Sequence, residues 1–591
     1  AELMGAYADT VGNLYYSGSG AGGVVEPRAR LLTDMYTRTT ADALNVTDAA
    51  HVNWRPLGWL TTTADLGINA ISRRDEMTQP RRSAGDAIYS GDIQDVEGTG
   101  FFNSGTGSSL VTTGNLGAIA VAPLMRGLRL RTAFGGNFTR TRTHDVLATG
   151  SDLSPGASDL TGARTIIATE QRSEITTFGW YIEPMIEHRR FYLSTGLRLD
   201  GADTYGSKQS LAGFPKVSLS YLLSDEPFFP FKGLFSTLRL RAAYGQAGVQ
   251  PGPADRLRLY TTTPRQLGGQ TVEAHQLSSV GNDQLKPERS DEFEGGLDAD
   301  LFGQAVTLEL TAYRKTRTDA LIPFTLPMSV NGGGTVLVNI GKVRNTGFEI
   351  GVGTQPLRSD LITIGTQMHL SRNENLVLST GDAGSINNLD GTRVVAGYPL
   401  FGRWARPILH YADADHDGII SPDEVQVGDS LVFLGPIEPN YEAALHTNVS
   451  LYRGTITLSA SFSYTRGQLQ INGAARNNQF ILRGANDPTA PLGEQAAVAA
   501  MNLTDYGLAQ ELSTFRFNSF AMALNASTAL AGRLFRARTA SLTLQGTNLG
   551  LWSNYRGKDP SVNAYATGND VADTGQLPLP RTWAVGIRLG Y

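Results

Sequence analysis

Residues 455–464 alternate strictly between two kinds of side chain. Thr and Ser occupy every second position, and Ile, Leu, Ala, Phe and Tyr occupy the positions between them. Because successive side chains of a β-strand point to opposite faces, this segment predicts a strand with one hydroxyl-lined face and one apolar face. A strand in a soluble core rarely keeps a hydroxyl at every inward position, whereas a wide barrel presents water inside and hydrocarbon outside. The pattern therefore favours the wall of a transmembrane β-barrel.

The last nine residues, 583–591, show the same period of two. Every odd position is apolar, and the aromatic residues Trp583 and Tyr591 lie at the two ends. An apolar band flanked by aromatic residues is typical of a strand that crosses the outer membrane. A half-buried strand of a soluble sandwich shares the alternation, so the assignment depends on how often the pattern recurs.

The alternation recurs along most of the chain. Segments of roughly ten residues repeat from about residue 52 to the end, separated by polar stretches rich in Gly, Asn, Asp and Pro. Clear examples are residues 190–200, 238–245, 306–313 and 540–548. We predict an all-β, antiparallel transmembrane β-barrel and count about sixteen strands. Residues 1–50 remain poorly assigned.

The gaps between these segments fall into two classes. Short gaps at residues 301–304 and 452–454 predict periplasmic hairpins, and long gaps near 247–289, 374–440 and 466–513 predict extracellular loops. The segment from 374 to 440 is the one that also carries a metal-binding motif.

The composition agrees with a barrel and limits the classes of partner and site that the chain can have. The 67 Gly and 26 Pro are spread along the chain as many turns require, and no apolar run is long enough for a transmembrane helix. The net charge of -5 is small for 591 residues, and scattered Lys and Arg give no electrostatic reason to expect nucleic acid. The absence of Cys excludes a disulfide scaffold and Cys-based zinc or redox sites.

Three groups of residues resemble one known family. Residues 281–290 (GNDQLKPERS) resemble the "N-x-x-L-K-P-E" signature of SusC/RagA-like TonB-dependent transporters, and residues 338–349 resemble their "N-x-G-x-x-x-N-x-G-x-E" element. Residues 312–321 are similar to the strand and loop that lie between these two motifs. Residues 191–244, 549–555 and 580–583 extend the resemblance, which in total spans about residues 180–591.

The resemblance implies segments that the sequence does not contain. Members of the family carry an N-terminal regulatory-like domain, a TonB box and a plug domain ahead of a barrel of about 22 strands. We find none of these segments, so the chain looks like the C-terminal portion of such a receptor, without its plug. An open sheet leaves two unpaired edges in hydrocarbon, where each unsatisfied backbone group costs several kcal/mol. We therefore expect either a preceding segment or a second polypeptide to complete the barrel.

The sharpest local motif is residues 413–424 (DADHDGIISPDE). It fits a twelve-residue calcium loop, with Gly418 at the position of the sharp turn. The predicted ligands of a structural calcium ion are Asp413, Asp415, Asp417, Ile419 through its carbonyl, Ser421 through a water, and Glu424 as the bidentate ligand. A solvated acidic turn held by side-chain hydrogen bonds is the alternative. The flanking residues 407–411 and 425–433 look irregular or extended, so no calcium-driven opening of helices is expected.

No catalytic constellation is evident in the sequence. It has no GxSxG, HExxH or P-loop motif, and its eight histidines are isolated from one another. Glu309, Asp319 and Glu349 are the best candidates for a carboxylate pair, but charges on a water-filled wall explain them better. We predict that the chain is not an enzyme.

Aromatic residues near the calcium motif are the weak candidates for substrate binding. Tyr398, Trp404, Tyr411 and Tyr441 have the flat faces that stack on sugar rings, although packing within the loop is the simpler explanation. The cluster at 228–231 (FFPF) is expected to anchor a turn at the membrane interface.

Taken with the resemblance, these features predict a barrel wall in the outer membrane of a Gram-negative-type bacterium. The implied activity is TonB-dependent import of oligosaccharides or peptides, and the implied partners are membrane lipid, the TonB complex and a SusD-like lipoprotein. Two alternatives remain: a structural, adhesive or passive-pore barrel completed by another polypeptide, and a soluble calcium-binding β-protein.

Overall fold

A computed structural model describes most of the chain. The described residues are 6–8, 14–16, 38–81, 100–206, 211–267, 270–326, 329, 335–339, 341–381, 385–387, 391–472, 488–557, 559–561, 564–565, 571–572 and 578–591.

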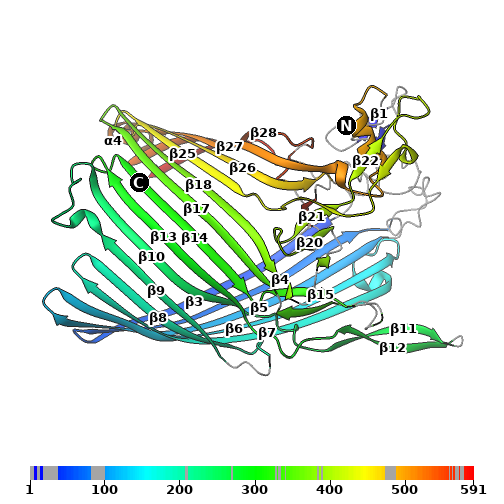
Figure 1. The fold of residues 1–591 in the computed structure, drawn as a ribbon, viewed down its shortest axis with the longest axis horizontal. Helices are drawn as coiled ribbons and strands as arrows, with labels where there is room; N and C mark the ends of the chain where they lie inside the picture. The colour runs from blue at the N-terminus through cyan, green and yellow to red at the C-terminus, as the bar shows by residue number, and fades with distance from the viewer. Residues whose placement is uncertain are drawn as a thin grey trace.

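One large antiparallel sheet forms the body of the molecule (Figure 1). Its first eight strands are β3 (Arg38–Leu57), β4 (Leu60–Gln79), β5 (Phe101–Met125), β6 (Leu128–Leu153), β7 (Ala163–His188), β8 (Phe191–Ala202), β9 (Ala212–Leu222) and β10 (Phe235–Val249). The other nine are β13 (Glu288–Leu301), β14 (Val306–Thr318), β17 (Lys342–Arg358), β18 (Ile362–Ser379), β25 (Tyr441–Leu451), β26 (Ile456–Ile471), β27 (Ala509–Asn525), β28 (Thr539–Ser553) and β31 (Thr582–Gly590).

Strands that follow one another in this series pair with each other. In β26, Ile456 pairs with Leu524 of β27 on one side and with Leu451 of β25 on the other. Because the register preserves the period of two, Leu458 lies on the same face, between Val449 and Met522, while Ser459 lies on the opposite face, between Asn448 and Ala521. One apolar face and one polar face therefore run across the sheet, as the alternation predicts.

The sheet curves into a barrel, but in the part of the chain that the structure describes its first and last strands do not pair with each other. Within the described residues, β3 pairs with β4 alone, and β31 pairs with β28 alone. Nearly all residues of these two strands are exposed. The described sheet therefore has two edges with no partner strand, which is the situation that the sequence led us to expect.

The strands depart from the expected bounds in two ways. The first strand of the wall begins at Arg38, before the alternation that we recognised near residue 52. Several strands are far longer than ten residues, with β6 and β7 containing 26 each. Both differences have one physical reason: hydrogen bonding between paired strands continues beyond the membrane, where alternation of polarity is no longer required.

The two ends of the barrel have different connections. At the short-turn end the connections are residues 58–59, 126–127, 189–190, 223–234, 302–305, 359–361, 452–455 and 526–538. At the long-connection end they are residues 80–100, 154–162, 203–211, 250–287, 319–341, 380–440, 472–508 and 554–581. The short turns lie at the left of Figure 1. The expected hairpins at 301–304 and 452–454 are therefore confirmed, and the turn at 452–455 uses Tyr452, Arg453 and Gly454 with positive φ.

The long connections contain elements that period-two reasoning did not predict. They include β11 (Leu259–Leu267) with β12 (Gln270–Ser279), β15 (Leu321–Thr325) with β16 (Thr335–Asn339), β19 (Ile386–Asn387), β20 (Thr392–Val394), β21 (Gly402–Ala405), β22 (Ile408–Tyr411), β23 (Val425–Val427), β24 (Val432–Gly435), helix α3 (Leu492–Ala499), β29 (Ala564–Tyr565) and β30 (Val571–Ala572). A second helix, α4 (Thr528–Phe535), lies at the short-turn end, and β1 (Ala6–Ala8) pairs with β2 (Leu14–Tyr16). No helix within the described residues is long and apolar enough to span a membrane.

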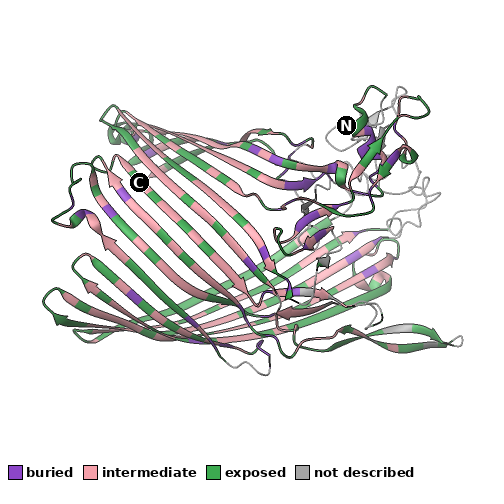
Figure 2. Ribbon diagram, in the orientation of Figure 1, coloured by how far each residue is buried: buried purple, intermediate pink, exposed green. Residues whose placement is uncertain are grey.

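Burial is concentrated at the long-connection end (Figure 2). Most wall residues are intermediate or exposed, because a single curved sheet has no second layer packed on either face. Small buried clusters instead hold the long connections together: one joins Ile420, Val425, Ala496 and Ala500, and another joins Ile471, Val498, Met501 and Leu508.

Candidate functional site

The polar face of the sheet is rich in charge along β10, β13 and β14. Asp298 of β13 accepts hydrogen bonds from both Arg239 and Arg241 of β10, at 2.9 Å and 3.1 Å from the two Nε atoms. Arg241 also pairs with Glu294. These partners point away from the apolar side chains of the same strands, such as Leu240 and Leu297, which pair across the two strands. The polar face is therefore a wall of ion pairs that suits contact with water.

A polar hollow on this face continues into β17 and β18. It is lined by Thr311 and Tyr313 of β14, Asn345 of β17 and Asn373 of β18, together with Glu309 and Glu349. Glu349 lies opposite Thr311, two residues from Glu309, so the two carboxylates are diagonal neighbours on one face. Asp319 follows the end of β14 and is not among the lining residues. The arrangement is that of charged groups on an open wall, as the sequence interpretation preferred over a catalytic pair.

The acidic loop, residues 413–424, lies between β22 and β23. A carboxylate oxygen from each of Asp413, Asp415 and Glu424 lies within 4.8 Å of the other two. The backbone of the turn has positive φ at His416 (61°) and at Gly418 (86°). Glycine adopts such a conformation without strain, which explains Gly418 at this position. Three of the predicted metal ligands are thus brought together by the fold.

Backbone donors hold the carboxylates of the acidic loop in place. Asp413 accepts hydrogen bonds from the backbone N–H groups of Asp417 (3.1 Å) and Gly418 (3.0 Å), and Asp417 accepts one from Ile419 (2.7 Å). Glu424 lies in the single-turn helix η5 (Pro422–Glu424) and accepts from Ser421 at 2.8 Å. Asp417 is not part of the close carboxylate group. The geometry therefore supports three of the six predicted ligands directly.

Glu424 is also held in its charged form. The backbone N–H groups of Ser421 and Ala414 hold the pKa of the Glu424 carboxyl below its ordinary value, because hydrogen bonds to a carboxylate favour ionisation. An ionised carboxylate is the form that a hard cation such as calcium requires.

One buried side chain joins the acidic loop to α3. Gln495 is almost fully buried, and its Oε1 accepts a hydrogen bond from the backbone N–H of Ile420 at 2.7 Å. Its Nε2 donates to the carbonyl oxygens of Gly418 (3.3 Å) and Ala490 (3.0 Å). Since Ile420 and Ala496 belong to the same buried cluster, loop and helix form one packed module. Sequence reasoning missed this contact, because Ile420 and Gly418 lie 75 and 77 residues before Gln495 in the chain.

The four aromatic candidates do not form one binding surface. Tyr398 and Trp404 pack against each other with ring centroids 4.7 Å apart, and both rings contact Phe433. Tyr441 instead lies beside the guanidinium of Arg372, 5.2 Å from the ring centroid. Tyr411 ends β22 and pairs with Val425 of β23. The structure thus brings together Tyr398 and Trp404, in a packing contact of the kind that the sequence analysis considered simpler.

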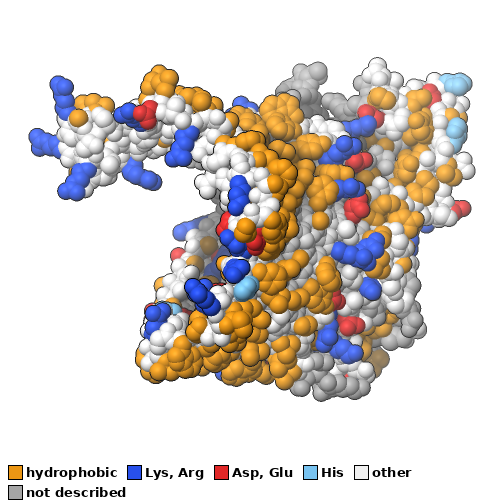
Figure 3. Space-filling view, turned by 60° about the vertical axis from the view of Figure 1, so that its left-hand side comes forward, with side chains coloured by type: hydrophobic (Ala, Val, Ile, Leu, Met, Phe, Trp, Pro, Cys, Tyr) orange, Lys and Arg blue, Asp and Glu red, His pale blue; other side chains and the backbone are white. Residues whose placement is uncertain are grey.

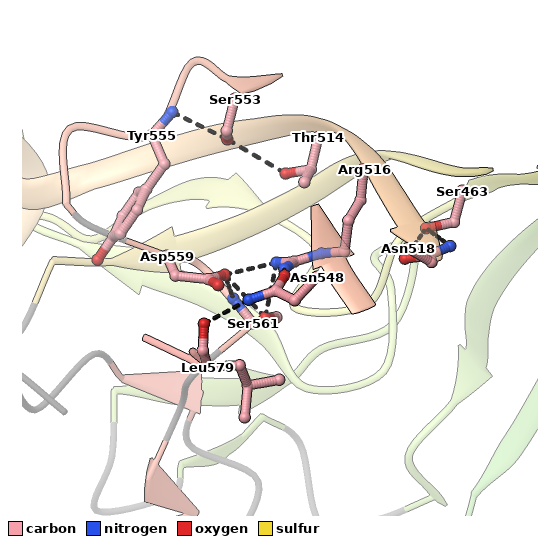
Figure 4. Close-up of polar contacts among 10 residues, drawn as sticks. All are labelled: Ser463, Thr514, Arg516, Asn518, Asn548, Ser553, Tyr555, Asp559, Ser561 and Leu579. Atoms are coloured by element: carbon pink, nitrogen blue, oxygen red, sulfur yellow. Dashed lines mark hydrogen bonds and ion pairs between the residues drawn. The ribbon is translucent and has the colours of Figure 1, made fainter. Parts of the chain in front are cut away.

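A buried ion pair anchors the connection between β28 and β31 to the polar face of β27 (Figure 4). Arg516 of β27 donates to Asp559 (2.6 Å), Ser561 (2.8 Å) and Asn548 (2.7 Å). Burial raises the pKa of Asp559, but the hydrogen bonds from Arg516 and Ser561 outweigh burial and hold the pKa below its ordinary value. Sequence reasoning missed this cluster, since nothing near residue 559 indicates a partner 43 residues away.

Comparisons with known proteins agree on the fold and the family. Residues 4–591 match the family model described as "TonB dependent receptor-like, beta-barrel". The chain is 25% identical over 455 residues to TonB-dependent receptor P26 of Formosa agariphila, covering 68% of this chain and 44% of that protein. It is 24% identical over 200 residues to TonB-dependent receptor SusC of Bacteroides thetaiotaomicron, covering 33% of this chain and 20% of that protein.

A solved structure of the RagAB peptide transporter has the same fold. It superposes with a TM-score of 0.80 at 17% sequence identity, covering 97% of this chain and 64% of that one. The chain spans less than half the length of the curated relatives that it matches.

Proposed function

This chain belongs to the TonB-dependent receptor β-barrel family as a SusC/RagA-like protein of the outer membrane, and we propose that it imports oligosaccharides or peptides. The comparisons confirm the family and the outer-membrane location that residues 281–290 and 338–349 predicted. The observation that best supports import is the polar face of the wall, where Arg239, Arg241 and Asp298 form ion pairs opposite a continuous apolar face. Such a wall keeps a water-filled path inside the membrane.

In this proposal the wall works with partners that the described residues do not include. A plug domain closes the path, and the TonB complex moves the plug at the expense of the proton-motive force. A SusD-like lipoprotein covers the long-connection end. The two edges at β3 and β31 are closed by further strands, from a preceding segment or a completing chain, because open edges in hydrocarbon leave backbone groups unsatisfied.

Uptake in cells tests this function. Labelled pools of oligosaccharides and of linear peptides are offered to the bacterium that carries the gene and to a strain with the gene deleted. Deletion is expected to abolish uptake from one pool, and a protonophore is expected to stop that uptake in the parent strain. Uptake from both pools that is unaffected by deletion would contradict the proposal, and the pool that is lost identifies the cargo class.

The passive-pore alternative predicts a different electrical behaviour. A barrel without a movable plug conducts ions steadily when the purified protein is placed in a planar lipid bilayer. A TonB-dependent importer with its plug in place stays closed under the same conditions. Steady conductance together with protonophore-insensitive uptake would replace the importer proposal by the pore.

We further propose that the acidic loop binds a structural calcium ion. Asp413, Asp415 and Glu424 already converge, and Asp417, the Ile419 carbonyl and Ser421 complete the loop positions that calcium uses. The ion would supply no chemistry. It would offset the mutual repulsion of the carboxylates and thereby stiffen the module formed with α3.

Terbium luminescence and calcium binding test this site in the purified protein. The double substitution Asp413→Ala and Glu424→Ala should abolish binding and raise hydrogen exchange in residues 412–424. Asp423→Ala is the matched control, because Asp423 lies in the same loop but not at a ligand position. Equal cation binding by the double variant and the parent would show that these residues are not the ligands.

A further inference from the structure

The short-turn end presents apolar side chains to solvent at six of its eight connections. Examples from different connections are Trp59, Phe228, Phe302, Leu361, Tyr452 and Leu534, all of which are exposed. Each of these side chains lies in a turn beyond the ends of the strands that the turn connects. Apolar residues at the tips of turns mark the level at which a barrel meets the headgroups of the membrane.

The same end carries an excess of positive charge. Its connections contain eight Lys or Arg residues but only three acidic residues: Asp225, Glu226 and Asp360. Two of those three are neutralised by ion pairs, Glu226 with Arg190 and Asp360 with Arg453. Six basic residues have no described ion pair: Arg126, Arg189, Lys232, Arg533, Arg536 and Arg538. Figure 3, in which this end is turned towards the viewer, shows Lys and Arg among hydrophobic side chains.

Both features are concentrated on α4 and the residues that follow it. Ala531 is fully buried against the sheet, whereas Leu530, Leu534 and Phe535 are exposed, with Leu534 at 62%. The chain leaves the helix at Arg536, whose φ of 55° ends it. Leu530 and Leu534 share one face because they are four residues apart, and Arg533 lies beside them. Exposed apolar side chains with arginines beside them suit a membrane interface, where the apolar groups meet acyl chains and the cations reach the headgroups.

The position of α4 favours a membrane over a protein partner. The helix joins β27 to β28, and the residues next to it on the apolar face, Leu524 and Leu542, pair with each other. The apolar surface of the barrel wall therefore continues towards α4. Arginines at the edge of that surface match headgroup phosphates, which accept two parallel hydrogen bonds from one guanidinium.

We propose that α4 and its arginines bind the anionic phospholipids of the leaflet that faces the short-turn end. Leu530, Leu534 and Phe535 insert among the acyl chains, while Arg533, Arg536 and Arg538 contact headgroup phosphates. The contact would fix the depth of the barrel in the membrane at the strand nearest to the edge formed by β31. It is independent of the cargo and of the calcium site.

Lipid binding by the protein purified from outer membranes in detergent tests this proposal. Fluorescent phosphatidylglycerol and phosphatidylcholine are titrated into the micelles, and their apparent affinities are compared. The double substitution Arg533→Gln and Arg538→Gln leaves Arg536 in its helix-ending conformation. At roughly 5-fold per arginine, it should weaken phosphatidylglycerol binding about 25-fold and leave phosphatidylcholine binding unchanged.

The control removes the same charge from the other end. Arg142→Gln with Arg172→Gln alters two exposed arginines in the halves of β6 and β7 that lie towards the long connections. This control should keep the phosphatidylglycerol preference, and high salt should reduce that preference in the parent protein. Equal affinity of the parent for both lipids would overturn the proposal. So would a loss as large in the control as in the α4 variant, or capture of an acidic periplasmic protein with no lipid preference.

Discussion

The two ends of the barrel are built on different principles. At the short-turn end, a connection such as 452–455 follows from three residues with positive φ and from the register of the strands on either side. At the long-connection end, the acidic loop is held by Gln495, and the connection after β28 is held by Arg516, both from distant parts of the chain. The conformation of the short-turn end follows from residues that are close in sequence. The long-connection end is held by buried polar contacts between distant segments.

Removal of Arg516 should have the largest effect on stability. Arg516→Ala leaves the carboxylate of Asp559 buried without its partner, a loss that typically costs about 3–5 kcal/mol. We expect residues 554–561 to leave the wall, detected by hydrogen exchange, together with a lower melting temperature.

An ion pair at the short-turn end provides the control for that substitution. Arg453 and Asp360 pair across two turns, but their side chains are 77% and 79% exposed. Arg453→Ala should therefore cost at most about 1 kcal/mol. Equal losses from the two substitutions would show that burial does not distinguish the two ends.

In the wall between the two ends, the effect of a charged substitution on stability should depend on which face of the sheet carries it. Leu458→Arg places a charge on the lipid face and should cost about 2–4 kcal/mol near the middle of the membrane. Ser459→Arg, one residue later, points to the polar face and should change stability little. Unfolding of both variants in urea, after refolding into lipid vesicles, measures the difference, and its absence would contradict the assignment of faces.

The contact between the acidic loop and α3 through Gln495 should contribute less to stability. Gln495→Leu keeps the approximate volume but leaves the backbone N–H of Ile420 without its acceptor, at a cost of about 1–3 kcal/mol. Limited proteolysis of residues 412–427 should become faster in this variant. A variant as resistant as the parent would show that the buried cluster alone holds the module.

Acidification should loosen the acidic loop, and this is the smallest of the expected effects. Because the pKa of Glu424 is lowered in the folded loop, its contribution is present above the ordinary pKa of a glutamate and is lost as the pH falls through the lowered value. Proteolysis of the loop should therefore accelerate as the pH falls below the ordinary pKa of a glutamate. In Glu424→Gln the rate of proteolysis should depend less on pH than in the parent. An unchanged dependence would show that other carboxylates cause it.

The extent to which the sequence predicts this structure follows the same division. Alternation located the wall strands around residues 455–464 and 583–591, since burial on one face and water on the other act on each residue separately. The convergence of Asp413, Asp415 and Glu424 was also predictable, because the loop spacing is local. Helix α3, Gln495 and the pair of Arg516 with Asp559 were not, because each depends on which distant segments meet.

Labelling of single cysteines tests the central claim most directly, that the wall separates hydrocarbon from a water-filled path. The sequence contains no native Cys, so substitutions from 456 to 463 can be introduced one at a time. In the protein in native outer membranes, a charged, water-soluble maleimide should label positions 457, 459, 461 and 463, and a lipid-soluble reagent should label 456, 458, 460 and 462. Equal labelling of the two sets by the charged reagent would contradict the account.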